Sequence, residues 1–287
     1  MQRLLFTNSR GKTVELGDNP PFILSKIDGL GDVEAENQTQ KAPYQDGSTY
    51  IDSLLNERII SMEISILAPS KGELSETRRH FSSVFSPKHG EGFLQYIYGN
   101  EIKTIKAVPE HVPIYPSGKD NRFDNLQMSI VTLKCANPHW MDLIETEKPL
   151  TAWLGKFEFP FEFPVEFGER ANRATLVNDG DVSTPVTIDF YGPATNPTVT
   201  NETTGEYIKV NRSLGAGDVL EVSTEFGNKT VEIVSADGNR TDVFNYIDLD
   251  SSFFQLLTGE NEISFSSDDA ESSGYVEIRY KNRYLAI

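Results

Sequence analysis

Cysteine is nearly absent from this chain of 287 residues. Cys135 is the one cysteine, so no disulfide can form within a single copy. The sequence therefore fits a protein that is made and folded in a reducing cytoplasm. Cys135 ends a strand-like run over 126–135, where we expect a small buried apolar side chain rather than a reactive thiol.

Long hydrophobic runs are also lacking. The first twelve residues, MQRLLFTNSRGK, contain no apolar core of the roughly 7–15 residues that a secretory signal requires. No run approaches the roughly 18 apolar residues that span a bilayer. We therefore expect no secretory leader, no transmembrane segment and no membrane partner.

Positive charge is scarce, because 26 Lys and Arg stand against 43 Asp and Glu, a formal net charge of −17. Residues 1–150 hold 16 basic and 20 acidic side chains, whereas residues 151–287 hold 10 and 23, so the excess acid lies in the second half. Without a basic cluster, we expect no stable nucleic-acid binding and no attachment to an anionic membrane. The plainest role of this charge is solubility.

The usual catalytic and metal-binding motifs are missing. The four histidines, His80, His89, His111 and His139, are at least nine residues apart, and with a single cysteine they make no zinc site of usual spacing. GxSxG, GxGxxG and phosphate-binding Gly-rich loops are absent as well. We therefore predict no catalytic residue, no metal site and no cofactor.

Two acidic clusters were weighed as exceptions. Asp248 and Asp250 form one, and Asp268, Asp269 and Glu271 form the other. Clustered carboxylates suit calcium, but no Asp-x-Asp-x-Asp-Gly loop is present, so a solvated surface is the favoured interpretation. The paired carboxylates of a glycoside hydrolase depend on the fold and not on spacing, which leaves a glycan-degrading enzyme as a weak third hypothesis.

What stands out instead is the stretch KFEFPFEFPVEFGE at 156–169. Apolar residues occupy every odd position from 157 to 167, and Glu or Pro occupies every even position between them. A period of two predicts an extended strand with one apolar face. Pro160 and Pro164 remove donors from the same edge, so the segment is expected to pair on one side only, as an edge strand or a docked connector.

The first half reads as a mainly antiparallel β domain with one helix. Strands are predicted at 3–8, 12–16, 22–24, 58–67, 92–98, 101–108 and 126–135. The polar segment 32–50 is expected to be a long exposed hairpin or loop. In 58–67, Ile60, Met62, Ile64 and Ile66 alternate onto one face.

The helix is predicted over 71–85. Ser70 supplies the N-cap and Glu73 its capping-box partner, and Pro87 ends the helix. An apolar stripe follows one face of it, at Leu74, Phe81, Val84 and Phe85. Farther on, the sequence Asn137-Pro-His-Trp140 indicates a bend held by packing.

The second half has short strands at regular spacing, which favours an antiparallel β-sandwich of jelly-roll type. Strands are predicted at 174–178, 184–192, 198–201, 206–210, 218–224, 229–234, 261–267 and 274–282. Residues 251–257 fit either a short helical turn or a strand. The tyrosines at 191, 207, 246, 275, 280 and 284 could stack on sugars, but most are expected in the core or on a sheet face.

The order of these segments resembles the distal tail protein family of long-tailed phages and prophages that infect Gram-positive bacteria. The resemblance is carried by Pro43-Tyr-Gln-Asp-Gly47, the strand beginning Arg58-Ile59-Ile60, the helix with Arg78, Ala136-Asn-Pro-His-Trp140, the 156–169 stretch, Asn178-Asp-Gly180, the turns around Gly217 and Asp218, Ser252-Phe-Phe-Gln-Leu256 with Gly259-Glu-Asn261, and Tyr280-Lys-Asn-Arg-Tyr284. It covers nearly the whole chain.

This resemblance implies three parts. Residues 1–145 would form a β-barrel-like, ring-forming domain with the helix 71–85 and a long hairpin. Residues 146–170 would form the Phe- and Pro-rich connector strand. Residues 171–287 would form a galectin-like β-sandwich at the periphery of the ring.

The resemblance also implies a function without chemistry. The protein would be a structural virion protein at the tail tip or baseplate, made in the bacterial host cytoplasm. Six copies would form a ring with a channel for DNA, and its partners would be itself, the tail tube protein, a tail-associated tip or lysin protein and receptor-binding proteins. The alternative is a carbohydrate-binding module that contacts host cell-wall glycans.

Two further hypotheses follow from the same resemblance. The polar 32–50 segment would belt the neighbouring subunit and become ordered on docking there. Carboxylates facing the lumen of the ring would keep DNA from adhering during ejection.

Overall fold

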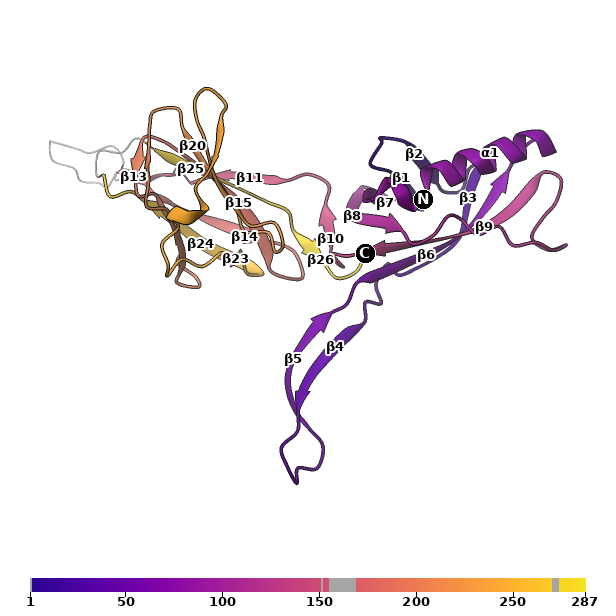
Figure 1. Cartoon of the computed structure of the whole chain (residues 1–287), viewed down its shortest axis with the longest axis horizontal. Helices are drawn as coiled ribbons and strands as arrows, with labels where there is room; N and C mark the ends of the chain where they lie inside the picture. The colour runs from indigo at the N-terminus through magenta and orange to yellow at the C-terminus, as the bar shows by residue number, and fades with distance from the viewer. Residues whose placement is uncertain (1, 151, 155–168, 270–273) are drawn as a thin grey trace, which may run out of the picture. The chain divides into compact units, whose positions relative to one another are not determined.

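Two separate hydrophobic cores divide the chain. The computed structural model describes residues 2–150, 152–154, 169–269 and 274–287. Unit 1 comprises Met1–Leu143 and Tyr284–Ile287, and unit 2 comprises Ile144–Arg283. Figure 1 shows the elements of both units. The predicted connector strand at 157–167 lies outside the described residues.

Unit 1 is a single antiparallel sheet with a helix packed against its inner face. Its elements are β1 (Gln2–Thr7), β2 (Thr13–Leu16), β3 (Phe22–Asp28), β4 (Ala35–Gln40), β5 (Thr49–Leu55), β6 (Arg58–Leu67), α1 (Lys71–Val84), the short 3-10 helix η1 (Pro87–His89), β7 (Gly92–Tyr98), β8 (Glu101–Pro109), β9 (Leu126–Cys135) and β10 (Trp140–Asp142). The strand order is β2-β1-β7-β8-β9-β6-β3, while β4 and β5 pair only with each other. The strands predicted in the first half are confirmed.

Helix α1 begins directly after its predicted N-cap residue, Ser70. The backbone N–H of Glu73 donates to Ser70 Oγ at 3.3 Å, and that hydroxyl donates to Glu73 Oε1 at 2.9 Å. The apolar stripe is buried as predicted. Phe81 meets Phe22 of β3 with ring centroids 4.9 Å apart, and Phe85 stacks on Phe6 of β1 at 4.7 Å. The helix is thereby fixed to two strands of the sheet.

Unit 2 is a β-sandwich. Its elements are β11 (Thr146–Pro149), β12 (Ala152–Leu154), β13 (Glu169–Ala171), β14 (Arg173–Asn178), β15 (Thr184–Tyr191), β16 (Ala194–Thr195), β17 (Thr198–Asn201), β18 (Glu206–Lys209), β19 (Ser213–Leu214), β20 (Val219–Ser223), β21 (Thr230–Val234), β22 (Arg240–Asp242), the 3-10 helix η2 (Phe244–Tyr246), β23 (Gln255–Leu256), β24 (Gly259–Ser266) and β25 (Tyr275–Tyr280). The strand β26 (Arg283–Tyr284) carries the chain back to unit 1.

Two sheets enclose the core of the sandwich. One has the order β11-β25-β15-β20-β21-β22 and the other β14-β24-β17-β18. Alternate residues of each sheet point inward, and Phe190 of β15 meets Phe265 of β24 edge to face with ring centroids 5.6 Å apart. The predicted sandwich is confirmed, and residues 251–257 contribute the short strand β23 rather than a helical turn. No helix in the described part of the chain is long and apolar enough to cross a membrane.

The boundaries differ from those expected in two places. The expected connector began at residue 146, but Thr146–Pro149 pairs with β25 and belongs to the sandwich. The expected sandwich ran to residue 287, but Tyr284–Ile287 joins unit 1. Strand β26 pairs with β10, and Ile287 packs against the core of unit 1. Sequence periodicity misses this return because β26 has two residues, too few to show a pattern.

The returning tail meets a buried arginine at the start of β6. Arg58 is only 1% exposed. Its Nε donates to the carbonyl of Pro138 at 2.7 Å, Nη1 donates to those of Gly29 and Gly31 at 2.8 and 2.6 Å, and Nη2 donates to that of Leu285 at 2.5 Å. Four carbonyls from three chain segments are therefore tied to one guanidinium.

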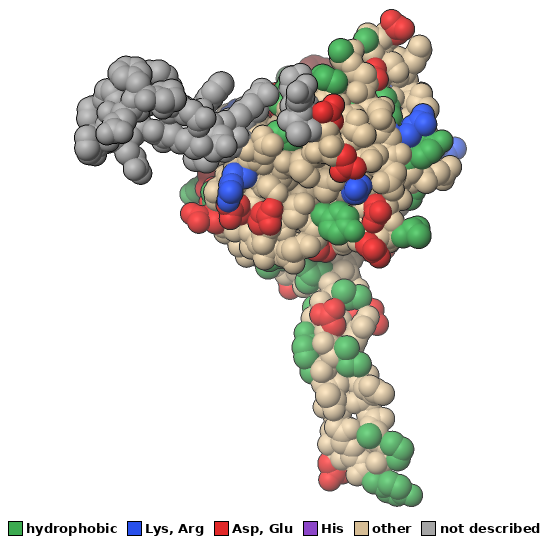
Figure 2. Space-filling view, turned by 90° about the vertical axis from the view of Figure 1, so that its left-hand side faces the viewer, with side chains coloured by type: hydrophobic (Ala, Val, Ile, Leu, Met, Phe, Trp, Pro, Cys, Tyr) green, Lys and Arg blue, Asp and Glu red, His purple; other side chains and the backbone are tan. Residues whose placement is uncertain are grey.

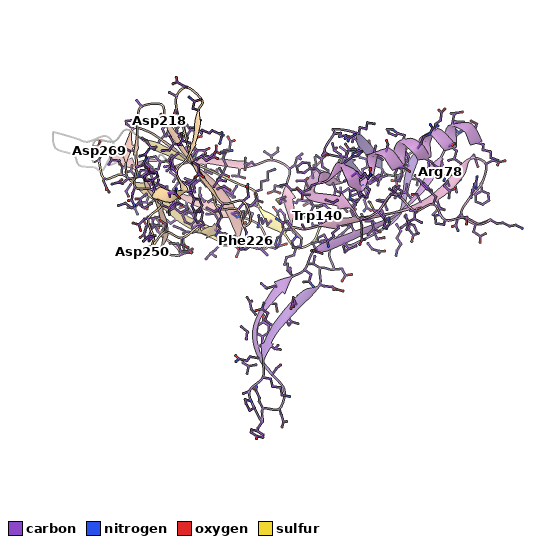
Figure 3. The ribbon with its side chains drawn as sticks, in the orientation of Figure 1. Arg78, Trp140, Asp218, Phe226, Asp250 and Asp269 are labelled. Carbon is purple, nitrogen blue, oxygen red and sulfur yellow. The ribbon has the colours of Figure 1, made fainter. Side chains whose placement is uncertain are left out.

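The surroundings of this guanidinium are neutral. None of the ion pairs between described residues involves Arg58, and burial lowers its pKa. The ring of Trp140 lies 5.9 Å from the guanidinium carbon, and its Nε1 donates to the carbonyl of Leu30 at 3.1 Å (Figure 3). Gly29 has φ +94°, and a Cβ there would overlap the carbonyl oxygen of Ile59. Only glycine allows this approach.

Replacing Arg58 with Met is expected to lower the free energy of unfolding of unit 1 by about 3 kcal/mol or more, because four carbonyls lose the buried donor that joins them. Urea unfolding followed by tryptophan fluorescence measures the change. Arg3→Met is the control: Arg3 is half-exposed and pairs with Glu15 at 3.4 Å, so its loss is expected to cost less than about 1 kcal/mol. Equal losses for the two variants would contradict the role given to Arg58.

Cys135 is completely buried, as predicted, and burial raises the pKa of its thiol to about 12. We expect the folded protein to resist iodoacetamide at pH 8 and to take up one equivalent in urea, measured by intact mass. The unfolded chain loses this proton at lower pH than the folded chain does. The free energy of unfolding should therefore fall as pH rises from about 9 towards 12. Fast labelling of the folded protein at pH 8 would show the site to be open.

Candidate assembly surfaces

The hairpin β4–β5 is the feature of unit 1 that its own chain does not support. It extends away from the sheet in Figure 1, and Figure 2 shows hydrophobic side chains along it and at its tip. Strand β4 is wholly exposed and contains no large apolar residue. The apolar side chains lie in β5 and the tip, at Tyr44, Tyr50, Ile51, Leu54 and Leu55, all exposed, and Tyr44 is 107% exposed. The long exposed segment predicted at 32–50 is confirmed as a hairpin, and it continues to Leu55.

A two-stranded hairpin that packs on nothing is marginally stable in water. The internal polar contacts of this one are few and exposed, such as Tyr50 Oη to Ser53 Oγ at 2.9 Å. Large apolar side chains held in water on a projecting arm mark an interaction surface. The hairpin therefore has the properties of an assembly element rather than of a catalytic site.

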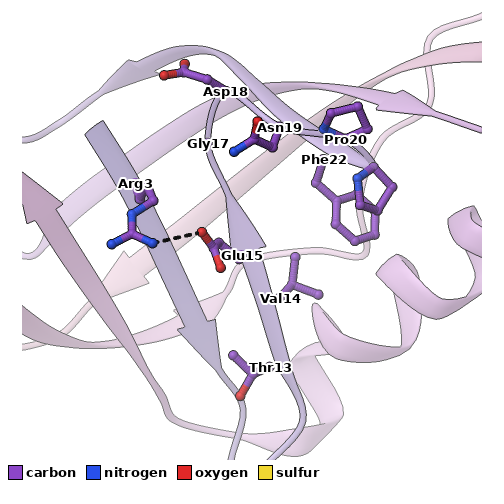
Figure 4. Close-up of a pocket in the computed structure, with 10 residues that line it drawn as sticks. Arg3, Thr13, Val14, Glu15, Gly17, Asp18, Asn19, Pro20 and Phe22 are labelled. Atoms are coloured by element: carbon purple, nitrogen blue, oxygen red, sulfur yellow. Dashed lines mark hydrogen bonds and ion pairs between the residues drawn. The ribbon is translucent and has the colours of Figure 1, made fainter. Parts of the chain in front are cut away.

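A concave surface feature lies beside β2. The cavity of about 370 Å³ is lined by Arg3 and Glu15, which pair at 3.4 Å, and by the turn from Gly17 to Phe22 (Figure 4). Its titratable groups are one ion pair and Asp18, and no histidine or cysteine lines it. This set offers no nucleophile with a neighbouring base. The cavity is therefore a surface recess at the end of the sheet.

Unit 2 presents a row of carboxylates across one outer sheet face. In the register of β25, β15, β20, β21 and β22, directly opposed positions are occupied by Glu277, Asp189, Glu221, Glu232 and Asp242. Like charges that face each other across strands are destabilising. The row is where much of the acidity of the second half is concentrated.

Two arginines relieve this repulsion. Arg279 donates to both carboxylate oxygens of Asp189, at 2.9 and 3.1 Å. Arg240 reaches Glu221 at 3.0 Å and Glu232 at 2.8 Å. Burial raises the pKa of Asp189 although Arg279 opposes that shift. The carboxylates are thus held by cross-strand arginines, and the sheet needs no bound cation to explain them.

The residues weighed as possible sites are not brought together. Asp248 accepts from Tyr207 Oη at 3.2 Å, and Asp268 accepts from Asn196 Nδ2 at 2.8 Å. Among the described residues no three metal-ligating side chains converge. Asp250 and Asp269 are labelled in Figure 3, and Glu271 lies outside the described residues.

The histidines are also dispersed. His89 Nε2 lies 3.0 Å from the carbonyl of Ser83, and His139 Nδ1 lies 3.0 Å from Asn137 Oδ1. His80 is exposed on α1 near Arg78, which stacks on the ring of Tyr115 at 4.4 Å. His111 lies in the loop after β8, with its Nδ1 3.1 Å from the carbonyl of Val112. Each position suits a structural or solvated histidine.

The tyrosines of the second half lie mainly where predicted. Tyr280 is buried, and Tyr191 and Tyr275 stack on a sheet face with ring centroids 4.3 Å apart. Burial and the neighbouring Glu277 raise the pKa of Tyr191 to about 12. Tyr246 is partly exposed beneath Arg212. Tyr284 belongs to unit 1, where its ring lies 3.6 Å from Lys103 Nζ.

Sequence reasoning missed two functional features. The role of Arg58 depends on carbonyls from three distant segments, which no sequence spacing reveals. An arginine at the start of a strongly apolar strand is the one signal that the sequence offers. The acidic row depends on the strand register, and its members are separated by up to 88 positions between Asp189 and Glu277. Its visible trace in the sequence is the excess of acid in the second half.

Comparison with protein families accounts for most of the chain. A family model described as "Phage tail protein RIFT-related domain" matches residues 9–135. One described as "Siphovirus-type tail component, C-terminal domain" matches residues 179–284. The two matches fall in unit 1 and unit 2 respectively. A search of the curated proteins found no match.

Solved structures share the fold. The crystal structure of the Dit protein of phage SPP1, described as a paradigm of the hub adsorption apparatus in phages infecting Gram-positive bacteria, is 12% identical with a TM-score of 0.71, covering 99% of this chain and 100% of that one. A chain of the phage P2 baseplate in its activated conformation with Ca is 12% identical with a TM-score of 0.57. That match covers 100% of this chain and 99% of the baseplate chain. A chain of the same baseplate with Sr is 10% identical with a TM-score of 0.58, and the match covers both chains fully. With both of its units matched by tail-component families, the chain belongs to the siphovirus distal tail proteins, components of the phage tail tip.

Proposed function

We propose that this chain is the hub of a phage baseplate, in which six copies close a ring around a channel for DNA. The observation that carries the proposal is the projecting hairpin, whose apolar side chains have no support from their own chain. A closed ring of identical copies needs a patch and a different complementary patch on every copy. The hairpin supplies the first. The relatives described as hub and baseplate proteins share this fold over the whole chain.

Within that ring, unit 1 forms the closed body and unit 2 serves the periphery. Unit 1 carries the hairpin, and its half of the chain is nearly neutral, so copies can pack without strong repulsion. Unit 2 carries the acidic row and a core of its own, which suits a module exposed to solvent. The ring would join the tail tube protein to a tail-associated tip or lysin protein and to receptor-binding proteins.

A carbohydrate-binding module is less well supported. Sugars stack on aromatic faces that are open to solvent, whereas Tyr191 and Tyr275 cover each other at 4.3 Å. Tyr191 Oη also donates to Glu277 at 3.2 Å. Polysaccharide that shifts a monomeric chain on a sizing column would favour this alternative.

Light scattering of the purified chain tests the ring and the role of the hairpin together. The wild type is expected near six times 32.1 kDa. Ile51→Asp combined with Leu54→Asp should give a monomer, because both side chains are exposed on the arm and a charge there cannot be buried at an interface.

Phe226→Asp is the matched control, since Phe226 is an exposed apolar residue of unit 2. Its assembly is expected to be unchanged. A hairpin variant that keeps the wild-type mass would remove the hairpin from the interface.

The isolated ring is expected not to bind double-stranded DNA even at about 50 mM salt, where phosphate contacts are strongest. The reason is the formal charge of −17 on every copy, which repels the phosphates. Fluorescence anisotropy with labelled DNA measures this. Affinity that appears at low salt and weakens as salt rises would contradict a channel that repels DNA.

A further inference from the structure

The outer face of β1, β7 and β8 carries an apolar patch that unit 1 leaves uncovered. In the strand register Thr7 opposes Phe93, Leu5 opposes Gln95, and Arg3 opposes Ile97, which in turn opposes Ile102. Directly opposed residues point to the same side of a sheet. Leu5, Phe93, Ile97 and Ile102, here named the outer patch, therefore share one face, opposite the face that holds the core.

The outer patch is not part of the core. The neighbouring inward residues Leu4, Phe6 and Leu94 are fully buried. Phe93, by contrast, is 48% exposed and Ile102 37%. The hydrophobic side chains that flank the core of unit 1 do not include the outer patch. Apolar side chains in contact with water on a flat sheet mark an interaction site.

The rim of the outer patch is charged but internally paired. Arg3 pairs with Glu15 at 3.4 Å on one side, and Lys106 with Glu91 at 3.8 Å on another. Gln95 lies between the members of the outer patch, and on the same face Arg3 opposes Ile97 and Lys106 opposes Phe93. Protein–protein interfaces likewise combine apolar contacts with polar groups.

The hairpin of another copy fits this face. Each hairpin strand has six or seven residues, about 20 Å of extended chain, close to the length of β1 and β7. The hairpin bears Glu36, Asp46 and Asp52 against Lys41. Its negative charge would meet Arg3 and Lys106, whose side chains are half-exposed on the same face as the outer patch.

The hairpin of one copy does not reach the outer patch of that same copy. Figure 1 shows the hairpin extending away from the sheet of its own unit. When a surface of one kind meets a surface of another kind on the next copy, the contact is head-to-tail. Such contacts form a ring where the rotation from copy to copy completes a circle.

We propose that the outer patch is the acceptor for the β4–β5 hairpin of the neighbouring copy. This inference rests on the proposed ring and specifies which surface of unit 1 closes it. Leu54 of β5 lies against Phe93 and Ile97, and the ion pairs of Arg3 and Lys106 flank the contact.

Cross-linking tests the contact directly. Leu54→Cys is prepared on one tagged chain and Ile97→Cys on another, and the two are mixed and oxidised. Cys135 is fully buried, so the introduced thiols are the reactive ones. The mixture should give a covalent pair with one copy of each variant, and neither variant alone should give it. Leu54→Cys mixed with Phe123→Cys is the control, since Phe123 is 54% exposed in unit 1 outside the outer patch.

Charge insertion gives a second test that needs no cross-link. Phe93→Glu with Ile97→Glu is expected to reduce the mass from six copies to one, whereas Val112→Glu with Phe123→Glu should keep six. Both double variants add two glutamates to the surface of unit 1. A difference in mass between them therefore reflects the position of the substitutions rather than the added charge.

The outcomes separate this proposal from the ring itself. A wild-type chain that is monomeric would overturn the ring, and the acceptor with it. A ring that persists with Phe93→Glu and Ile97→Glu, or a cross-link to Phe123→Cys equal to that with Ile97→Cys, would leave the ring standing and overturn the outer patch as acceptor. Loss of tail tube protein binding, with the ring intact, would assign the patch to that partner instead.

Discussion

A guanidinium buried without a carboxylate is the constraint on which unit 1 depends. Arg58 is held by carbonyls at Gly29, Gly31, Pro138 and Leu285. Removing an ion from water is costly unless every donor finds an acceptor. The three segments that carry these carbonyls must therefore stay close to Arg58. Because Gly29 and Gly31 precede β4, and Arg58 follows β5, the same guanidinium closes the base of the projecting hairpin.

The two units distribute charge differently, and the difference agrees with their proposed places. Unit 1 buries Arg58 among backbone carbonyls, and ion pairs such as Arg3 with Glu15 and Lys26 with Asp28 lie on its surface. Unit 2 accepts a row of facing carboxylates and offsets the repulsion with Arg279 and Arg240. A ring body must tolerate close neighbours, whereas a peripheral sandwich benefits from a surface that resists association.

The sequence predicts what repeats locally and misses what depends on distant partners. The alternation Ile60, Met62, Ile64 and Ile66 predicts the buried face of β6 because a strand repeats every two residues. Ser70 and Glu73 locate the start of α1 for a similar local reason. The hairpin was expected from polarity over 32–50, but its apolar half in β5 was not, since exposed Ile51 and Leu54 resemble core residues in a sequence.

The parts that could not be predicted share a physical cause. The return of Tyr284–Ile287 to unit 1 and the role of Arg58 rest on hydrogen bonds between residues up to 227 positions apart. The outer patch and the acidic row exist only once the strand register is known. The expectation of a ring follows from the family resemblance. The residues proposed to form it, in the hairpin and the outer patch, are identified by their exposure in the structure.

The proposed hub requires unit 1 of this chain to close into a ring through its hairpin. Electron microscopy of the purified protein tests this closure most directly, because class averages show symmetry as well as size. We expect closed rings with sixfold symmetry, a central channel and peripheral density from unit 2. Isolated single copies, or open filaments in place of closed rings, would contradict it.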